Sequence, residues 1–318
     1  MNVRRRLISA TAVTAATALG LGALSACSSD SAATGNTDKF DVVASFYPMA
    51  FLAEQIGGDH ANVTSLTEPG QEPHDLEIST KQRAQLEEAD AALFLKGLQP
   101  AVDEAVSQTG IKTKIDAASL TSLEDHGGTE HAHEGEEGHA EEEEHARDPH
   151  IWLDPVKYAE VAESVGKAFE KADPDHAADY KKNTEALVKK LNGLDGDFEN
   201  GLKNTKTKVF FTNHAAFGYL AERYGLTQEA ISGLDPESEP SAARVRELQQ
   251  EAKADGVTTV FYETLVSDKT AKTLAKDAKL KTDVLDPLEG ITDKSRGDDY
   301  FQVMEANLKA LQAALGAK

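Results

Sequence analysis

The sequence predicts an α/β protein with two lobes, each built on about four mainly parallel strands flanked by helices, and one long helix joining the lobes. Three observations carry this prediction. With 318 residues, 40% of them hydrophobic, the chain can bury sizeable cores and is long enough for two domains. In both halves, short β-branched and aromatic runs alternate with helical patterns, which is typical of parallel sheets covered by helices. Between the halves, residues 155–205 show helical patterns only.

The first 26 residues have the pattern of a signal peptide. Arg4–Arg6 precede an apolar and small-residue stretch, and small residues precede Cys27. Cys27 is the chain's only cysteine, so an intrachain disulfide is excluded. Its position resembles the lipobox of bacterial lipoproteins, in which this cysteine is lipidated and becomes the N-terminus; the alternative is an ordinary secretory peptide with an incidental cysteine. Residues 27–39 are polar and predict a flexible tether.

Residues 40–154 are expected to form the N-terminal lobe. Strands are predicted at 40–46, 61–66 and 90–95, and helices at 47–58, 79–89 and 99–108. Ser79 is the expected N-cap of the second helix. A loop rich in histidine and glutamate, residues 124–148, interrupts the alternation.

Residues 155–205 predict two helices, of which the second joins the lobes. That helix is expected over 173–203, with Asp173 as its cap and Pro174 at its first position. At about 1.5 Å per residue it would reach about 45 Å. Residues 206–318 are expected to form the C-terminal lobe. Its strands are predicted at 208–212, 228–232, 257–263 and 281–286, and its helices at 215–225, 240–256, 267–278 and 298–315.

The formal net charge of −22 makes nucleic acid an improbable partner, because a nucleic-acid binder needs a basic face to neutralise phosphates. Much of the charge is local: residues 124–148 hold eleven acidic side chains and one arginine.

Three isolated histidines and two carboxylates lie where predicted strands end. In parallel sheets, ligands gather in the loops after the strands, so residues from both lobes would converge on the cleft between them. Neutral imidazoles with a carboxylate suit Zn²⁺. Each histidine alone could equally be a hydrogen-bonded loop or core residue. The five residues are His74, His150, His214, Asp286 and Glu289.

The segments around these residues resemble one family. "EPHDLE", "DPHIWLDP", "HAAFGYLAERYGL" and "VLDPLEG" are similar to the metal-binding substrate-binding lipoproteins of bacterial ABC importers, the zinc/manganese family of cluster A-I type. Together with the lipobox and the acidic histidine-rich loop, they resemble its high-affinity zinc-uptake branch over residues 40–318. The resemblance implies two lobes joined by a rather rigid long helix, with one metal ion buried between them.

The resemblance implies a ligand set. His74, His150 and His214 match the family's three histidine ligands, and the third position usually holds glutamate in manganese-type members, so His214 favours Zn²⁺. The fourth ligand is Asp286, Glu289 or water, with a preference for Glu289. Glu263 is interpreted as supporting a ligand from behind, and Trp152 as packing around the site.

The remaining histidines of the loop have no pattern that could pack. They predict either a solvated loop without a specific role or weak auxiliary zinc binding. Removal of the loop should leave zinc binding at the tight site intact. They are His126, His131, His133, His139 and His145.

The predicted function is an extracytoplasmic, lipid-anchored receptor that captures Zn²⁺ and delivers it to an ABC permease and its ATPase at the cell membrane. We expect a monomer without enzymatic activity. The alternatives are a manganese receptor, a zinc-dependent hydrolase, since three histidines can also hold a catalytic metal, and a zinc-storing surface adhesin.

Overall fold

The first half of the chain assembles a four-stranded parallel sheet in the computed structural model, which describes residues 39–126 and 147–317. The strands are β1 (Phe40–Ala44), β2 (Ala61–Ser65), β3 (Ala91–Phe94) and β4 (Thr113–Asp116), in the order β2-β1-β3-β4. The helices around them are α1 (Tyr47–Gly57), α2 (Thr80–Glu88) and α3 (Pro100–Gln108). We call this unit the N-terminal lobe.

The second half repeats this arrangement as the C-terminal lobe. Its strands are β5 (Val209–Thr212), β6 (Thr227–Ala230), β7 (Thr259–Tyr262) and β8 (Lys281–Val284), all parallel in the order β6-β5-β7-β8. Its helices are α6 (Gly218–Arg223), α7 (Ala242–Ala254), α8 (Lys269–Ala278) and α9 (Tyr300–Leu315). The predicted fold class is confirmed.

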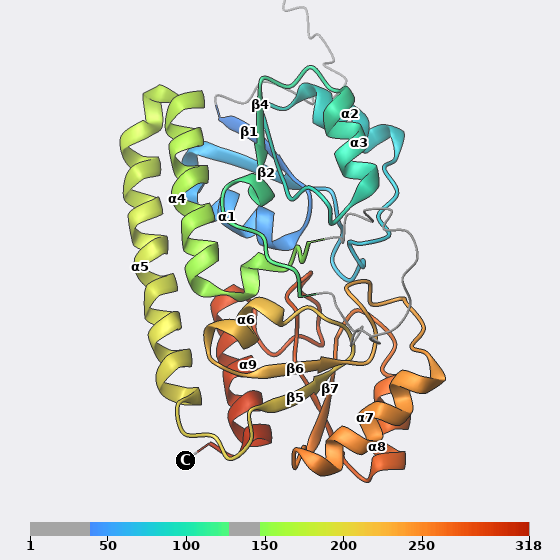
Figure 1. Ribbon diagram of the computed structural model, residues 1–318. Helices are drawn as coiled ribbons and strands as arrows, with labels where there is room; N and C mark the ends of the chain where they lie inside the picture. The colour runs from blue at the N-terminus through green and yellow to red at the C-terminus, as the bar shows by residue number, and fades with distance from the viewer. Residues whose placement is uncertain (1–38, 127–146, 318) are drawn as a thin grey trace, which may run out of the picture. The chain divides into compact units, whose positions relative to one another are not determined.

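Two antiparallel helices pack against each other, and the longer of them runs along one side of both lobes (Figure 1). The first is α4 (Pro155–Ala172), and the second is α5 (Ala177–Leu202), whose 26 residues reach about 39 Å at about 1.5 Å per residue. Helix α5 packs on α1 and α4 of the N-terminal lobe and on α9 of the C-terminal lobe. The buried stripe that fixes this packing is Tyr180, Thr184, Leu187, Leu191, Leu194, Phe198 and Leu202.

Two expectations are corrected. Helix α5 does not begin at Pro174: residues Pro174–His176 form a 3-10 turn, and the Asp173 carboxylate accepts hydrogen bonds from His176 Nδ1 (2.7 Å) and Tyr180 Oη (2.6 Å) instead of capping the backbone. Strand β4 was not among the predicted strands. Its four residues, "TKID", include only one buried side chain, too little for a period-two pattern to stand out.

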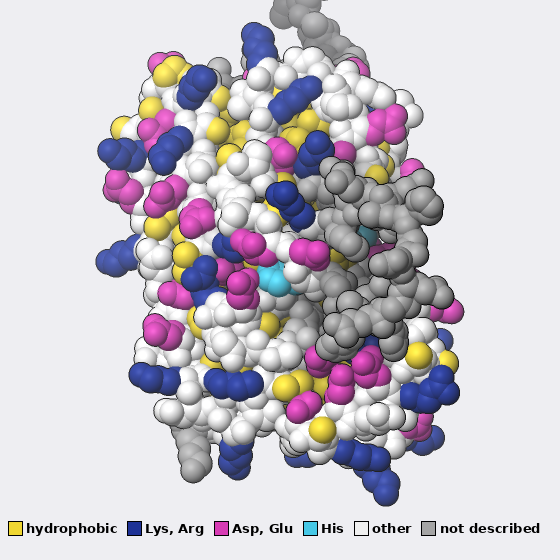
Figure 2. All heavy atoms as spheres, in the orientation of Figure 1, with side chains coloured by type: hydrophobic (Ala, Val, Ile, Leu, Met, Phe, Trp, Pro, Cys, Tyr) yellow, Lys and Arg dark blue, Asp and Glu magenta, His cyan; other side chains and the backbone are white. Residues whose placement is uncertain are grey.

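One hydrophobic cluster runs through both lobes. It joins Val42 of β1 and Phe169 of α4 to Phe210 of β5 and Leu311 of α9, with Phe198 of α5 between them. Each lobe adds a smaller cluster of its own. Within the described residues, no helix is long and apolar enough to span a bilayer. On the face drawn in Figure 2, the described basic and acidic side chains are intermixed.

Candidate metal centre

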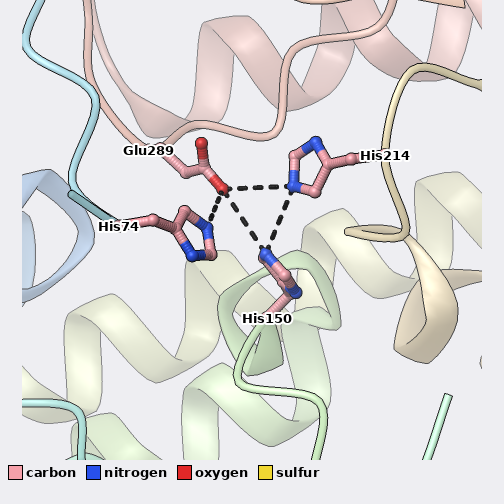
Figure 3. Close-up of side chains that lie close together, drawn as sticks. All are labelled: His74, His150, His214 and Glu289. Atoms are coloured by element: carbon pink, nitrogen blue, oxygen red, sulfur yellow. Dashed lines mark hydrogen bonds and ion pairs between the residues drawn. The ribbon is translucent and has the colours of Figure 1, made fainter. Parts of the chain in front are cut away.

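Four side chains that are far apart in the sequence meet between the lobes (Figure 3). His74 lies in the loop between β2 and α2, and His150 directly precedes the 3-10 turn Ile151–Leu153. His214 follows β5 by two residues, and Glu289 lies in the segment between β8 and α9. Three of the four therefore come from the carboxyl ends of parallel strands, where ligands gather in such sheets.

Four of the six distances between the potential ligand atoms match those of a tetrahedral metal site, and all four atoms lie within 4.8 Å of one another. Glu289 Oε1 lies 3.2 Å from His74 Nε2 and 3.4 Å from both His150 Nε2 and His214 Nε2. The Nε2 atoms of His150 and His214 are also 3.4 Å apart. Ligands bound at about 2.0–2.1 Å to tetrahedral Zn²⁺ lie about 3.3–3.4 Å from one another. The arrangement therefore fits a zinc ion with small adjustments of the side chains.

Carboxylates behind two of the imidazoles turn Nε2 toward the centre. Asp148 Oδ1 accepts hydrogen bonds from His150 N (2.9 Å) and Nδ1 (2.7 Å), and Glu263 Oε1 accepts one from His214 Nδ1 (2.6 Å). A proton held on Nδ1 leaves the Nε2 lone pair free for a metal. Glu263 thus lies directly behind His214.

Most of the centre is shielded from bulk water. The side chains of His150, His214 and Glu289 are fully buried, and His74 is 11% exposed. Burial lowers the pKa of His150, but its bonds to Asp148 and Glu289 outweigh this effect and raise it above the usual value. Burial likewise lowers the pKa of His214, which Glu263 and Glu289 raise far more. Burial raises the pKa of Glu289, yet the three imidazoles hold it well below its usual range.

The charge balance favours a divalent cation. Three anionic carboxylates, Asp148, Glu263 and Glu289, lie at or directly behind the cluster, and neutral imidazoles add no charge. Glu289 Oε2 is buried without a hydrogen-bond partner in the described part of the chain, as is Glu263 Oε2. Buried anions of this kind need a counter-charge, which protonated histidines or a bound metal supply.

Asp286, the other candidate for the fourth ligand, does not reach the cluster. Its Oδ1 accepts a hydrogen bond from Leu288 N (2.9 Å), and its Oδ2 accepts bonds from Thr264 Oγ1 (3.2 Å) and Ser295 Oγ (3.0 Å). Its backbone exchanges two hydrogen bonds with the Asn307 amide of α9. Asp286 therefore shapes the loop that presents Glu289, and the structure brings Glu289 to the histidines.

Trp152 ties that loop to the other lobe. Its indole Nε1 donates to Pro287 O (2.7 Å), and its ring lies 5.2 Å from that of His150 between ring centroids. The residue packs beside the centre, as expected from the sequence.

Of the predicted auxiliary histidines the structure describes only His126, which is not part of this cluster. His126 contacts Asp148 and Glu222 instead. His131, His133, His139 and His145 lie outside the described residues, as does Cys27.

Two residues near the centre were not predicted from the sequence. Asp148 precedes His150 by two positions. A carboxylate so close to a candidate ligand could have been recognised from the sequence as its hydrogen-bond partner, but Asp148 stands at the end of a long run of acidic residues. Glu72 has a similar position before His74; burial and the nearby Glu289 raise its pKa to about 7.

Comparisons with known proteins agree on one family. The family model described as "Zinc-uptake complex component A periplasmic" matches residues 42–314. The chain is 40% identical over 299 residues to the zinc-binding lipoprotein AdcA of Streptococcus pneumoniae, a match that covers 91% of this chain and 58% of that relative. The chain thus spans little more than half the length of AdcA.

Two further matches cover their counterparts almost completely. The high-affinity zinc uptake system protein ZnuA of Bacillus subtilis is 35% identical over 315 residues, with 94% of this chain and 98% of that protein covered. The crystal structure of the Zn(II)-bound ZnuA-like domain of Streptococcus pneumoniae AdcA superimposes with a TM-score of 0.71 at 36% identity, covering 87% of this chain and 99% of that domain.

Proposed function

The chain belongs to the ZnuA family of periplasmic zinc-uptake components, and from this premise we propose that it captures Zn²⁺ outside the cytoplasm and delivers it to an ABC importer. This membership confirms the resemblance that the motifs predicted. In this role the metal ion is the cargo and not a resident cofactor.

One observation carries the proposal: three imidazoles and one carboxylate, supplied by both lobes, bring their ligand atoms within 4.8 Å of one another around the Glu289 carboxylate. A set of three nitrogens and one oxygen favours Zn²⁺ over Mn²⁺, which prefers oxygen ligands. His74 and His150 come from one lobe and His214 and Glu289 from the other, so a bound ion joins the lobes. Release then requires the two halves of the ligand set to separate.

The same geometry argues against the alternative of a zinc hydrolase. A catalytic zinc keeps one coordination position open for water or substrate. Here Glu289 supplies the fourth ligand atom beside three histidines, and three of the four side chains are fully buried. The cluster is suited to enclosing an ion rather than to presenting it to a substrate.

The proposed partners follow from the family. We expect an ABC permease and its ATPase to receive the ion, and lipidated Cys27 to anchor the monomeric receptor at the extracytoplasmic face of the cell membrane. The relative AdcA is named a lipoprotein, which supports the anchor.

Metal competition tests the proposed function. Mature protein, titrated with Zn²⁺ in the presence and absence of Mn²⁺, is expected to bind one Zn²⁺ tightly and to retain it against excess Mn²⁺. The double variant His150→Ala, His214→Ala should lose this site, whereas His60→Ala, a change at a partly exposed histidine outside the cluster, should keep it. Preference for Mn²⁺, or tight zinc binding by the double variant, would contradict the proposal.

A further inference from the structure

The first histidine of the acidic loop, His126, is packed against the C-terminal lobe. The side chain of His126 is 17% exposed, and its ring packs edge-on against Tyr219 of α6, with centroids 4.5 Å apart. Its Nδ1 lies 2.8 Å from Asp148 Oδ2 and its Nε2 lies 3.1 Å from Glu222 Oε2. Because ionised carboxylates only accept hydrogen bonds, Nδ1 carries a proton directed at Asp148.

The backbone around this histidine is held just as closely. Asp148 N donates to Glu124 O (3.0 Å), so the two ends of the acidic loop are paired. Tyr219 Oη accepts a hydrogen bond from Glu124 N (2.9 Å) and donates one to Asp148 O (2.7 Å). His126 and Asp148 are therefore fixed relative to each other and to α6.

Asp148 links His126 to the metal centre, since it divides its two oxygens between two imidazoles. Oδ1 accepts from His150, and Oδ2 accepts from His126. The Asp148 carboxylate is fully buried. Among the described residues, Oδ2 would have no hydrogen-bond partner without His126, and no other described side chain would hold the carboxylate plane that aligns His150.

Gly218, the first residue of α6, makes room for this pair. A Cβ atom there would lie 2.4 Å from His126 Cβ and 2.8 Å from Asp148 Oδ2. Glycine, which has no Cβ, allows this close approach at the start of α6. The close approach is to the two side chains that lead to His150.

We propose that His126 is a positioning residue of the metal centre: it holds Asp148 in the orientation in which that carboxylate presents His150 to the metal. The inference rests on the proposed zinc binding and deepens it. The sequence groups His126 with the other histidines of the acidic loop, but this inference gives it a different role.

Three variants test this role by zinc affinity, measured in competition with a chelator. His126→Ala is expected to raise the dissociation constant about tenfold, the lower end of the range for partners behind metal ligands. His126→Asn places an amide N–H near the position of Nδ1 and should restore most of the affinity. The control is His176→Ala, which removes a histidine with the same Nδ1–aspartate contact (2.7 Å to Asp173) at the distant α4–α5 turn, and should leave the constant unchanged.

A spectroscopic readout separates positioning from general stability. In protein labelled with ¹⁵N-histidine, the Nδ1 proton of His150 should exchange faster with solvent in His126→Ala than in the wild type or His126→Asn. Gly218→Ala should also make the Nδ1 proton of His150 exchange faster, although this variant retains every metal ligand and every hydrogen-bonding side chain. Deletion of residues 127–146, with His126 kept and a short glycine linker added, should leave the affinity unchanged.

The outcomes distinguish a failure of the proposed function from a failure of the role of His126. Wild-type protein that fails to bind zinc would contradict the proposed function and, with it, this inference. Wild-type binding with an unchanged constant in His126→Ala would overturn only the role of His126. That role is also overturned if His126→Asn is as weak as His126→Ala, or if the loss tracks a fall in unfolding temperature that His176→Ala shares.

Discussion

The two fully buried imidazoles of the cluster each lie between carboxylates, and this makes zinc binding a competition with protons. Glu289 faces both rings, while Asp148 and Glu263 support one ring each. In the metal-free protein these anions stabilise the protonated rings, and they raise the pKa of His150 and His214 against the effect of burial. A metal must displace the Nε2 protons before it binds.

Zinc affinity is therefore expected to fall as pH falls, and the fall should begin above the ordinary histidine pKa of about 6.5. The direction follows from the raised pKa values of His150 and His214. At a pH above these pKa values the rings are neutral and bind zinc without losing a proton, whereas below them each zinc ion that binds must displace protons. Calorimetric titrations between about pH 8 and about pH 5.5, in buffers of different ionisation enthalpy, measure both the affinity and the protons released. Affinity that is constant over this range, with no proton release, would count against the histidine ligands.

Glu263 gives a second prediction at this scale. Glu263→Gln keeps an acceptor for His214 Nδ1 but removes a negative charge behind the metal, and is expected to weaken zinc binding about tenfold. Chelator competition measures the change. The matched control is Asp173→Asn, which neutralises a carboxylate bound to His176 far from the centre. Equal affinity in the wild type and both variants would show that Glu263 is incidental.

The sequence indicated which histidines to consider, because strand ends identify the edge of a sheet where loops meet. It could not choose between Asp286 and Glu289, since the two lie three positions apart in the same segment between β8 and α9. The choice depends on hydrogen bonds from Thr264, Ser295 and Leu288, which occupy Asp286 and turn it from the centre. These partners are distant in sequence or depend on the loop conformation. The role of each residue in metal binding remains a prediction.

At the scale of elements, hydrophobic periodicity located nearly every strand and helix, because most of them bury at least one side chain in the core. The failures came where side-chain chemistry overrides the pattern. At the start of α5, the Asp173 carboxylate engages His176 and Tyr180, so a 3-10 turn replaces the expected first helical turn. Strand β4 has four residues and a single buried side chain, so its pairing with β3 defines it.

Glycines in α5 supply a prediction for this scale. At Gly193 and Gly196 an added Cβ would meet nothing within 4 Å, so each change to alanine is expected to raise the free energy of unfolding by about 0.5–1 kcal/mol. At Gly201 the Cβ would lie 2.6 Å from Gln312 Nε2 and 3.0 Å from Leu308 Cδ1 of α9. Gly201→Ala should therefore raise the free energy of unfolding by less than the other two changes. Urea unfolding measures all three. Equal gains at the three positions would mean that α5 and α9 are not closely packed at Gly201.

The whole molecule combines a continuous core with a centre shared by two lobes. The hydrophobic cluster that runs from β1 through α5 to α9 resists a wide hinge opening, because separation of the lobes would expose buried side chains on both sides. Polar contacts act in the same direction: Trp152 donates to Pro287 O, and Tyr300 Oη donates to Trp152 O (2.7 Å). Changes on metal binding should therefore be confined to loops, among which the His74 loop is the one whose ligand is partly exposed.

Zinc should consequently stabilise the protein strongly while changing its size little. An ion held by ligands from both lobes adds about 4 kcal/mol to the free energy of unfolding when its free concentration is about 1,000 times the dissociation constant, which raises the unfolding temperature by several degrees. Calorimetry with zinc and with chelator measures this shift, and solution X-ray scattering measures the radius of gyration in the same two states. His150→Ala should abolish the shift, and His60→Ala should preserve it. A large decrease in the radius with zinc would indicate wide closure of the lobes and contradict the rigid core, whereas an unchanged unfolding temperature would contradict a centre that joins them.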